Sequence, residues 1–144
     1  MKPASVTVPA TPDFVRAASQ FVVQTARHLG VVAASSPLFE VAIVEAFANA
    51  VKHGSRGKSG AMVSCEIERT AAGLRIRIYD EGEGFAPSAR ATPAVDPASA
   101  DIAALPESGY GVPIMHSVFQ HIDGRRVGDR FCLELTLSAG QPMA

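Results

Sequence analysis

Three polar side chains recur at every fourth position along a mostly apolar part of the chain. Glu45 and Asn49 lie within residues 38–51, which are mostly aliphatic or Phe, and His53 and Gly54 follow directly. On a helix this spacing places the three polar side chains on one ridge. A carboxylate and an amide on a largely buried helix are costly without a partner. The ridge therefore either faces solvent or a neighbouring loop, or it faces a ligand. In the second case Asn49 would bind a hard cation and Glu45 would accept a proton.

A second carboxylate, Asp80, continues the apolar face of a strand-like segment. Residues 74–80 alternate with period two, which puts Leu74, Ile76, Ile78 and Asp80 on one face and Arg75, Arg77 and Tyr79 on the other. A carboxylate on the apolar side needs hydrogen-bond donors. Gly82 and Gly84 follow at once and allow backbone to approach a ligand closely. The segment is either an acidic turn, in which Asp80 binds local backbone N–H groups, or a ligand-binding loop.

A third glycine-containing segment precedes a short apolar stretch. Gly109, Tyr110 and Gly111 are followed by Pro113, which a helix tolerates only in its first turn. A helix therefore begins near Gly111, and its unpaired N–H groups would suit phosphates. An ordinary loop-to-helix turn is the alternative. The segment lacks the Gly-Lys-Ser/Thr ending of a Walker motif.

The composition of the chain limits the classes of function. Its 144 residues fit one domain, residues 1–144, and 47% hydrophobic residues suffice for a core, mainly aliphatic because Trp is absent. The net charge of −1 argues against a nucleic-acid-binding surface and against a polybasic membrane patch.

Alternating and helical patterns predict an α+β fold. A Pro- and Ala-rich stretch, residues 86–106, indicates a loop rather than a packed element. Thr11 is predicted to cap the first helix with its hydroxyl, with Pro12 at the first helical position. The expected helices are residues 12–29, 38–53 and 111–121, and the expected strands are residues 6–8, 61–70, 73–80, 125–127 and 131–137. Together they predict a two-layer α/β sandwich, in which helices cover a mixed, mostly antiparallel sheet.

The first residues and the cysteines bear on the compartment. The N-terminal residues show no apolar run followed by a cleavage site, and we expect a cytoplasmic protein without a secretory signal. Cys65 and Cys132 both lie in strand-like runs. Two buried free thiols are favoured over a disulfide between them.

The three motifs, taken in this order, resemble the Bergerat-type (GHKL) ATPase and kinase superfamily, which includes type II topoisomerases, sensor histidine kinases and mismatch-repair ATPases. Residues 45–54, Glu-Ala-Phe-Ala-Asn-Ala-Val-Lys-His-Gly, look like its N box. Residues 80–85, Asp-Glu-Gly-Glu-Gly-Phe, look like the first glycine box, and residues 109–111 look like the second. The resemblance extends from about residue 5 to residue 137 and implies the histidine-kinase-like ATPase sandwich.

The resemblance also implies roles for these residues. Asn49 would hold Mg²⁺ at the phosphates of ATP or ADP, and Glu45 would orient or deprotonate the attacking hydroxyl group. Asp80 would accept a hydrogen bond from the adenine amino group. Residues 85–108 would form a lid over the nucleotide. The remaining positions of the three boxes would contact nucleotide, and they are His53, Gly54, Gly82, Gly84, Gly109, Tyr110 and Gly111.

Within the superfamily, the short chain and the motif Asn-Ala-Val-Lys-His-Gly look most like those of the partner-switching anti-sigma serine kinases of bacteria. Such a protein would bind a sigma factor or an anti-anti-sigma protein of STAS type, and it would form a homodimer through its first strand and helix. Two departures concern the phosphates. Residues 85–108 contain one basic residue, Arg90, and residues 129–131, Asp-Arg-Phe, stand where the family often has a Gly-Thr pair.

Two functions of different class follow from the resemblance. The first is an ATP-dependent protein kinase that phosphorylates Ser or Thr on an anti-sigma antagonist, and the presence of Glu45 favours it. The second is a module that binds nucleotide and sequesters its partner without significant kinase activity, and the sparsely charged lid favours that one.

Overall fold

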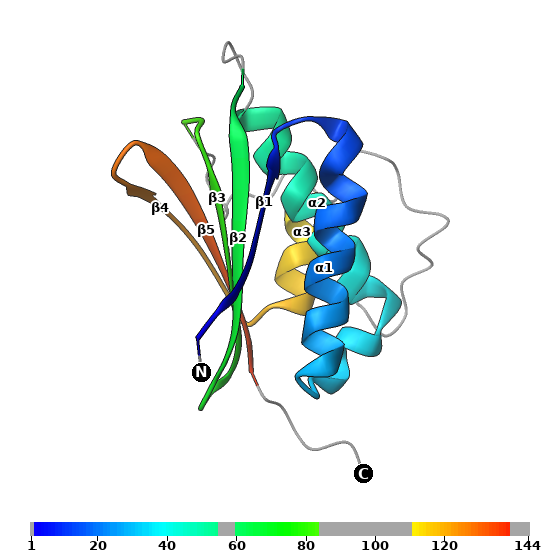
Figure 1. The fold of residues 1–144 in the computed structure, drawn as a ribbon. Coiled ribbons are helices and arrows are strands. Elements are labelled where there is room, and N and C mark those ends of the chain that lie inside the picture. Colours follow the sequence, from blue (N-terminus) through cyan, green and yellow to red (C-terminus); the bar gives the residue numbers. More distant parts are fainter. Residues whose placement is uncertain (1, 55–59, 84–110, 139–144) are drawn as a thin grey trace.

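The structure is a computed structural model, and it describes residues 2–54, 60–83 and 111–138. In these ranges a five-stranded sheet forms one layer and helices form the other, on a single face of the sheet (Figure 1). Every pairing between the described strands is antiparallel. The predicted α+β two-layer sandwich is therefore confirmed.

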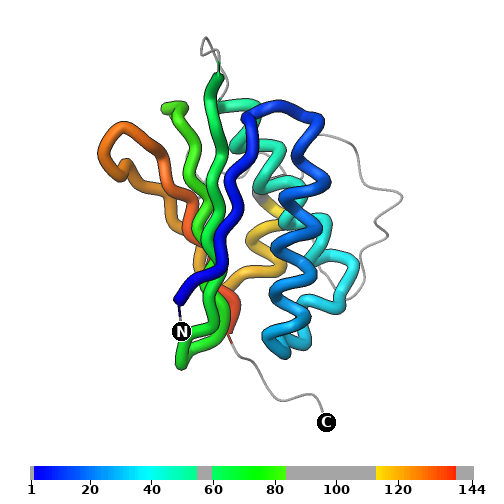
Figure 2. Tube along the Cα trace, in the orientation of Figure 1, coloured from blue at the N-terminus to red at the C-terminus, as the bar shows by residue number. Residues whose placement is uncertain are grey.

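The strands appear close to their predicted positions, with one difference at the edge of the sheet. They are β1 (Ala4–Pro9), β2 (Met62–Thr70), β3 (Gly73–Asp80), β4 (His121–Val127) and β5 (Arg130–Ser138), in the spatial order β1-β2-β3-β5-β4 (Figure 2). Strand β4 begins at His121 instead of near Arg125. Ile122 is the one large apolar residue at its start, so alternation is not visible there. Pairing with β5, for example Ile122 with Leu135, nevertheless extends the strand.

The helices are α1 (Val15–His28), α2 (Pro37–Gly54) and α3 (Gly111–Val118), with 3-10 turns η1 (Pro12–Phe14) and η2 (Val32–Ser35). The predicted hydroxyl cap at Thr11 is wrong, because its side chain makes no capping hydrogen bond. The Thr11 backbone carbonyl instead accepts from the N–H of Phe14, which closes the 3-10 turn. Ser36 does cap, because the N–H of Leu38 donates to its hydroxyl at 3.3 Å. Helix α3 ends at Val118, earlier than predicted.

Helix α2 occupies the middle of the helical layer. It packs between α1 and α3 and lies against β3 and β2. Its fully buried side chains include Phe39, Ile43 and Phe47, which belong to the same core cluster as Ile76 and Ile78 of the sheet. Burial of apolar side chains from both layers fixes α2 on the sheet, at about 1.5–3 kcal/mol for each large side chain. The ridge of α2 is thereby held in a defined place.

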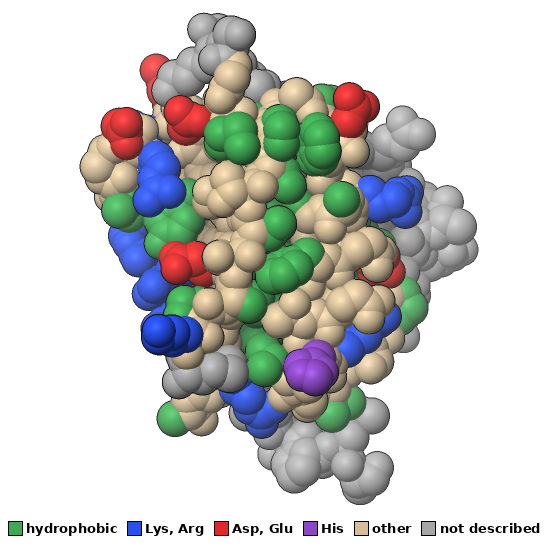
Figure 3. Space-filling view, in the orientation of Figure 1, with side chains coloured by type: hydrophobic (Ala, Val, Ile, Leu, Met, Phe, Trp, Pro, Cys, Tyr) green, Lys and Arg blue, Asp and Glu red, His purple; other side chains and the backbone are tan. Residues whose placement is uncertain are grey.

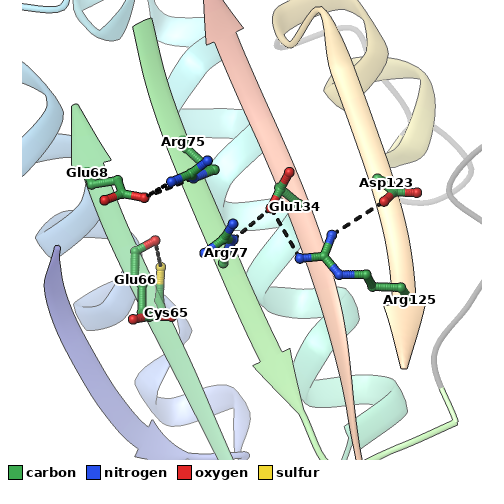
Figure 4. A network of polar contacts seen from close by, with 8 residues as sticks. All are labelled: Cys65, Glu66, Glu68, Arg75, Arg77, Asp123, Arg125 and Glu134. Atoms are coloured by element: carbon green, nitrogen blue, oxygen red, sulfur yellow. Dashed lines mark hydrogen bonds and ion pairs between the residues drawn. The ribbon is translucent and has the colours of Figure 1, made fainter. Parts of the chain in front are cut away.

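The opposite face of the sheet carries charged side chains in pairs. Arg77 and Glu134 are joined at 2.6 Å, Arg75 is paired with Glu68, and Arg125 lies 3.5 Å from both Glu134 and Asp123 (Figure 4). We call this side of the sheet the open face.

Apolar side chains reach the molecular surface in a band between the sheet and α1 (Figure 3).

Both cysteines are free and buried, as predicted. Cys65 lies opposite Ile78 and Cys132 lies opposite Tyr79 in the sheet register. Because Ile78 and Tyr79 are successive residues of one strand, the two thiols project from opposite faces of the sheet. A disulfide between them is therefore sterically excluded. Within the described ranges, no helix combines the length and the apolar character needed to cross a membrane.

Candidate functional site

The polar ridge of α2 lies at the margin of the core. Glu45, Asn49 and His53 are each partly buried, whereas Ala46 and Ala50 beside them are buried. Desolvation raises the pKa of the Glu45 carboxyl above its ordinary value of 4.5. A carboxylate with a raised pKa holds a proton more readily, which is the property expected of a general base.

Asp80 ends β3 as a buried carboxylate, 2% exposed, among the apolar residues of the core. Its Oδ1 accepts a hydrogen bond from the N–H of Gly82 at 2.8 Å. The local-turn interpretation of this segment therefore holds for that oxygen atom. The same bond fixes the orientation of the carboxylate, which a binding group also requires.

Two glycines allow the Asp80 segment to contact the end of α2. A Cβ at Gly82 would lie 2.1 Å from the carbonyl oxygen of His53, and a Cβ at Gly54 would lie 2.8 Å from the Cβ of Asp80. Such distances are far below van der Waals contact, so neither position accepts a side chain without movement of the backbone. The structure thus brings His53, Gly54, Asp80 and Gly82 together. The close contact with Asp80 gives a packing reason for a glycine at position 54.

Two further contacts hold residues 80–82, which comprise the last residue of β3 and the two that follow it and which we call the Asp80 loop. The N–H of Met62 on β2 donates to Oε2 of Glu81 at 2.5 Å. Arg126 on β4 donates through Nη1 to the carbonyl oxygen of Gly82, also at 2.5 Å. Sequence reasoning missed both, because they depend on the order of the strands in the sheet.

Other predicted site residues lie at or beyond the limits of the described structure. Gly84, Gly109, Tyr110 and the lid, residues 85–108, fall outside the described residues. Gly111 is the first residue of α3, which confirms the predicted helix start, and Pro113 lies in its first turn. Because α3 packs against α2, the beginning of α3 belongs to the same helical layer as the polar ridge.

The described residues contain no group of three or more His, Cys, Asp or Glu side chains placed to hold a metal ion. The predicted metal ligand, Asn49, is an amide. Its oxygen is a hard donor of the kind that Mg²⁺ accepts when phosphates and water supply the remaining ligands.

Comparison with known proteins identifies the family and supports the fold. The family model described as "Histidine kinase-like ATPase domain" matches residues 8–137. Among solved structures, the fold is similar to that in the crystal structure of the RsbU and RsbW domains of Rv1364c from Mycobacterium tuberculosis. The TM-score is 0.62 at 16% identity, and the match covers 96% of this chain but only 33% of that one. No curated protein sequence matches. Since the family model spans most of the sequence, the chain belongs to the histidine kinase-like ATPase family.

Proposed function

We propose that this protein is an ATP-binding serine/threonine kinase that acts as an anti-sigma factor in a partner-switching module and phosphorylates an anti-anti-sigma protein of STAS type. The observation that carries the proposal is the contact between the end of α2 and Asp80. This contact joins a buried, oriented carboxylate to the helix that bears Glu45 and Asn49. Family membership supports nucleotide binding, and the sequence of residues 45–54 supports the assignment to the partner-switching kinases.

Asp80 would recognise the base of the nucleotide. An ionised carboxylate only accepts hydrogen bonds, and the 6-amino group of adenine is a donor. Its apolar surroundings suit the faces of an aromatic ring. Gly82 and Gly84, together with His53 and Gly54, would surround the base, while Gly109, Tyr110 and Gly111 at the start of α3 would offer N–H groups to the phosphates.

Asn49 and Glu45 would act at the other end of the nucleotide. Asn49 would hold Mg²⁺, which neutralises phosphate charge during transfer. Glu45 would orient the hydroxyl group of the substrate and accept its proton, and the raised pKa of this carboxyl suits that task. Both side chains are partly buried and are spaced by one turn of α2.

The protein partners belong to the same proposal. A sigma factor or a STAS-type antagonist in the cytoplasm would be bound, and a homodimer would form through β1 and α1. The second candidate is a nucleotide-binding module that sequesters its partner without significant phosphotransfer. It is favoured because residues 85–108 contain only one basic residue, Arg90, with which to contact the terminal phosphate.

The test begins with calorimetric titration of ADP and ATP with and without Mg²⁺. Absence of binding would overturn both candidates. Protein that binds is then incubated with γ-labelled ATP, Mg²⁺ and candidate STAS domains. The kinase proposal expects transfer by the parent and by Glu40→Gln, a matched control on the first turn of α2. Glu45→Gln should retain nucleotide affinity and lose transfer. Equal transfer by Glu45→Gln would remove the proposed base, and binding without any transfer would favour sequestration.

A further inference from the structure

Strand register places Arg126 on the same side of the sheet as Asp80. Asp80 on β3 lies opposite Phe131 on β5, and Phe131 lies opposite Arg126 on β4. Residues directly opposite one another in a sheet project to the same face. Asp80 and Phe131 are both buried on the helical side. Arg126 therefore belongs to the face that carries the candidate site.

The neighbouring arginine has the other orientation. Arg125 lies opposite Cys132 and contacts Glu134 and Asp123 on the open face (Figure 4). The two arginines are adjacent in sequence and equal in charge, but their side chains project from opposite faces of the sheet. Arg125 is thus a matched control for any role of Arg126.

The side chain of Arg126 crosses β5 to reach the Asp80 loop. Neighbouring strands lie about 4.8 Å apart, so β4 and β3 are separated by about 10 Å. Arg126 spans this gap and donates through Nη1 to the carbonyl oxygen of Gly82 at 2.5 Å. The N–H of the same glycine donates to Oδ1 of Asp80 at 2.8 Å. Gly82 is therefore held through its carbonyl by Arg126, and through its N–H it holds Asp80.

We infer that Arg126 is a positioning residue for the nucleotide site: it fixes the backbone of Gly82 and, through it, the carboxylate of Asp80. The inference deepens the proposed function and rests on Asp80 as the group that binds the base. Glycine has the widest choice of backbone conformations of any residue. Without the contact from Arg126, the Asp80 loop spends part of its time in other conformations. Affinity for a ligand falls in proportion to the fraction of competent molecules.

The first measurement is nucleotide affinity. Arg126→Ala is expected to weaken binding of AMP, ADP and ATP by the same factor, about three- to tenfold, since one hydrogen bond is lost and the base is common to all three. Arg126→Lys keeps a cationic donor and should recover part of the loss. Arg125→Ala should bind all three nucleotides as the parent does. A loss that grows with the number of phosphates would overturn the inference, because Arg126 would then act on the phosphates directly.

The second measurement needs no nucleotide. Amide hydrogen exchange of Gly82, followed by NMR, should be faster in Arg126→Ala than in the parent and unchanged in Arg125→Ala. Unchanged exchange in Arg126→Ala would overturn the inference. If the parent binds no adenine nucleotide, the proposed function fails. Faster exchange in Arg126→Ala would then still support the positioning of the Asp80 loop by Arg126.

Discussion

Two carboxylates of the candidate site, Glu45 and Asp80, are held in different ways by their surroundings. Glu45 lies partly buried on the ridge of α2, and desolvation raises the pKa of its carboxyl. Asp80 is buried at the end of β3, where the N–H of Gly82 fixes one of its oxygen atoms. The first environment favours exchange of a proton, and the second favours a fixed acceptor of hydrogen bonds.

The raised pKa of Glu45 predicts that its ionised carboxylate lowers the free energy of unfolding in a pH-dependent way. At pH values above 4.5, the ordinary pKa of the Glu45 carboxyl, the unfolded chain loses the carboxyl proton more readily than the native protein does. The native carboxylate therefore reduces stability as pH rises through the interval between the two pKa values. Glu45→Gln is expected to raise the free energy of unfolding at pH 7, and the gain should disappear below pH 4.5. Denaturant titrations of both proteins at the two pH values measure this. An equal difference in the free energy of unfolding between variant and parent at both pH values would assign the effect to packing.

Asn49 predicts a dependence of nucleotide affinity on Mg²⁺. Its amide oxygen is the proposed protein ligand, so Asn49→Ala should weaken ATP binding in the presence of Mg²⁺ and change it little in the presence of EDTA. Calorimetry under both conditions measures the two affinities. Equal affinities of variant and parent with Mg²⁺ would contradict the assignment. Asn49→Asp, which retains an oxygen ligand, should keep most of the Mg²⁺ dependence.

Among the secondary-structure elements, contacts from the sheet fix the ends of the helices. Arg69 on β2 donates to the carbonyl oxygen of Leu29, directly after α1. The end of α2 lies against Asp80. Cations near the carboxyl end of a helix compensate its dipole and satisfy its last carbonyl groups.

Arg69→Ala is therefore expected to lower the free energy of unfolding by about 0.5–1 kcal/mol. Arg69→Lys should restore part of this, because it keeps the charge. Arg16→Ala is the control, since Arg16 lies in the first turn of α1, where the dipole disfavours a cation. This control should not destabilise the protein. Urea titrations compare the four proteins, and equal losses in both alanine variants would refute the capping role.

Sequence patterns predicted the elements that carry strong periodicity. Leu74 to Asp80 alternates clearly, and both the strand and the burial of Asp80 are found as predicted. The start of β4 was misplaced because His121 to Gly124 offers one large apolar residue, and tertiary pairing defines that edge strand. The contact of Arg126 with Gly82 gives no local signal at all. It arises from the order β3-β5-β4, which the sequence pattern does not specify.

At the scale of the whole molecule, the sheet separates two kinds of chemistry. The helical side contains the core and the candidate site, and the open face pairs its charges across neighbouring strands. Desolvation opposes ionisation of Glu134, but Arg77 and Arg125 outweigh it and lower the pKa of this carboxyl. The net charge of −1 argues against a broad basic surface. It says nothing against one enclosed polyanion that is bound by N–H groups and a cation.

The two thiols report on the integrity of both faces. Desolvation raises the pKa of Cys65 and of Cys132, so that few thiolates exist near neutral pH. Ellman's reagent is expected to react with neither thiol in the native protein and with both in denaturant, without prior reduction. The melting temperature should be the same with and without reductant. Absence of both thiols in denaturant, with their recovery after reduction, would reveal a disulfide and contradict the placement of the cysteines on opposite faces.

Helix α2 sets the spacing between the two ends of the candidate site. Glu45 and Gly54 belong to one continuous helix, and Gly54 lies against Asp80. At about 1.5 Å per residue, nine positions separate them by about 13 Å along the helix axis. Inserting one residue between Asn49 and Gly54 would lengthen this distance and turn the ridge by about 100°. We therefore expect the segment to tolerate no insertion or deletion, because either would displace Asp80 relative to Glu45 and Asn49, the groups proposed to bind the two ends of the nucleotide.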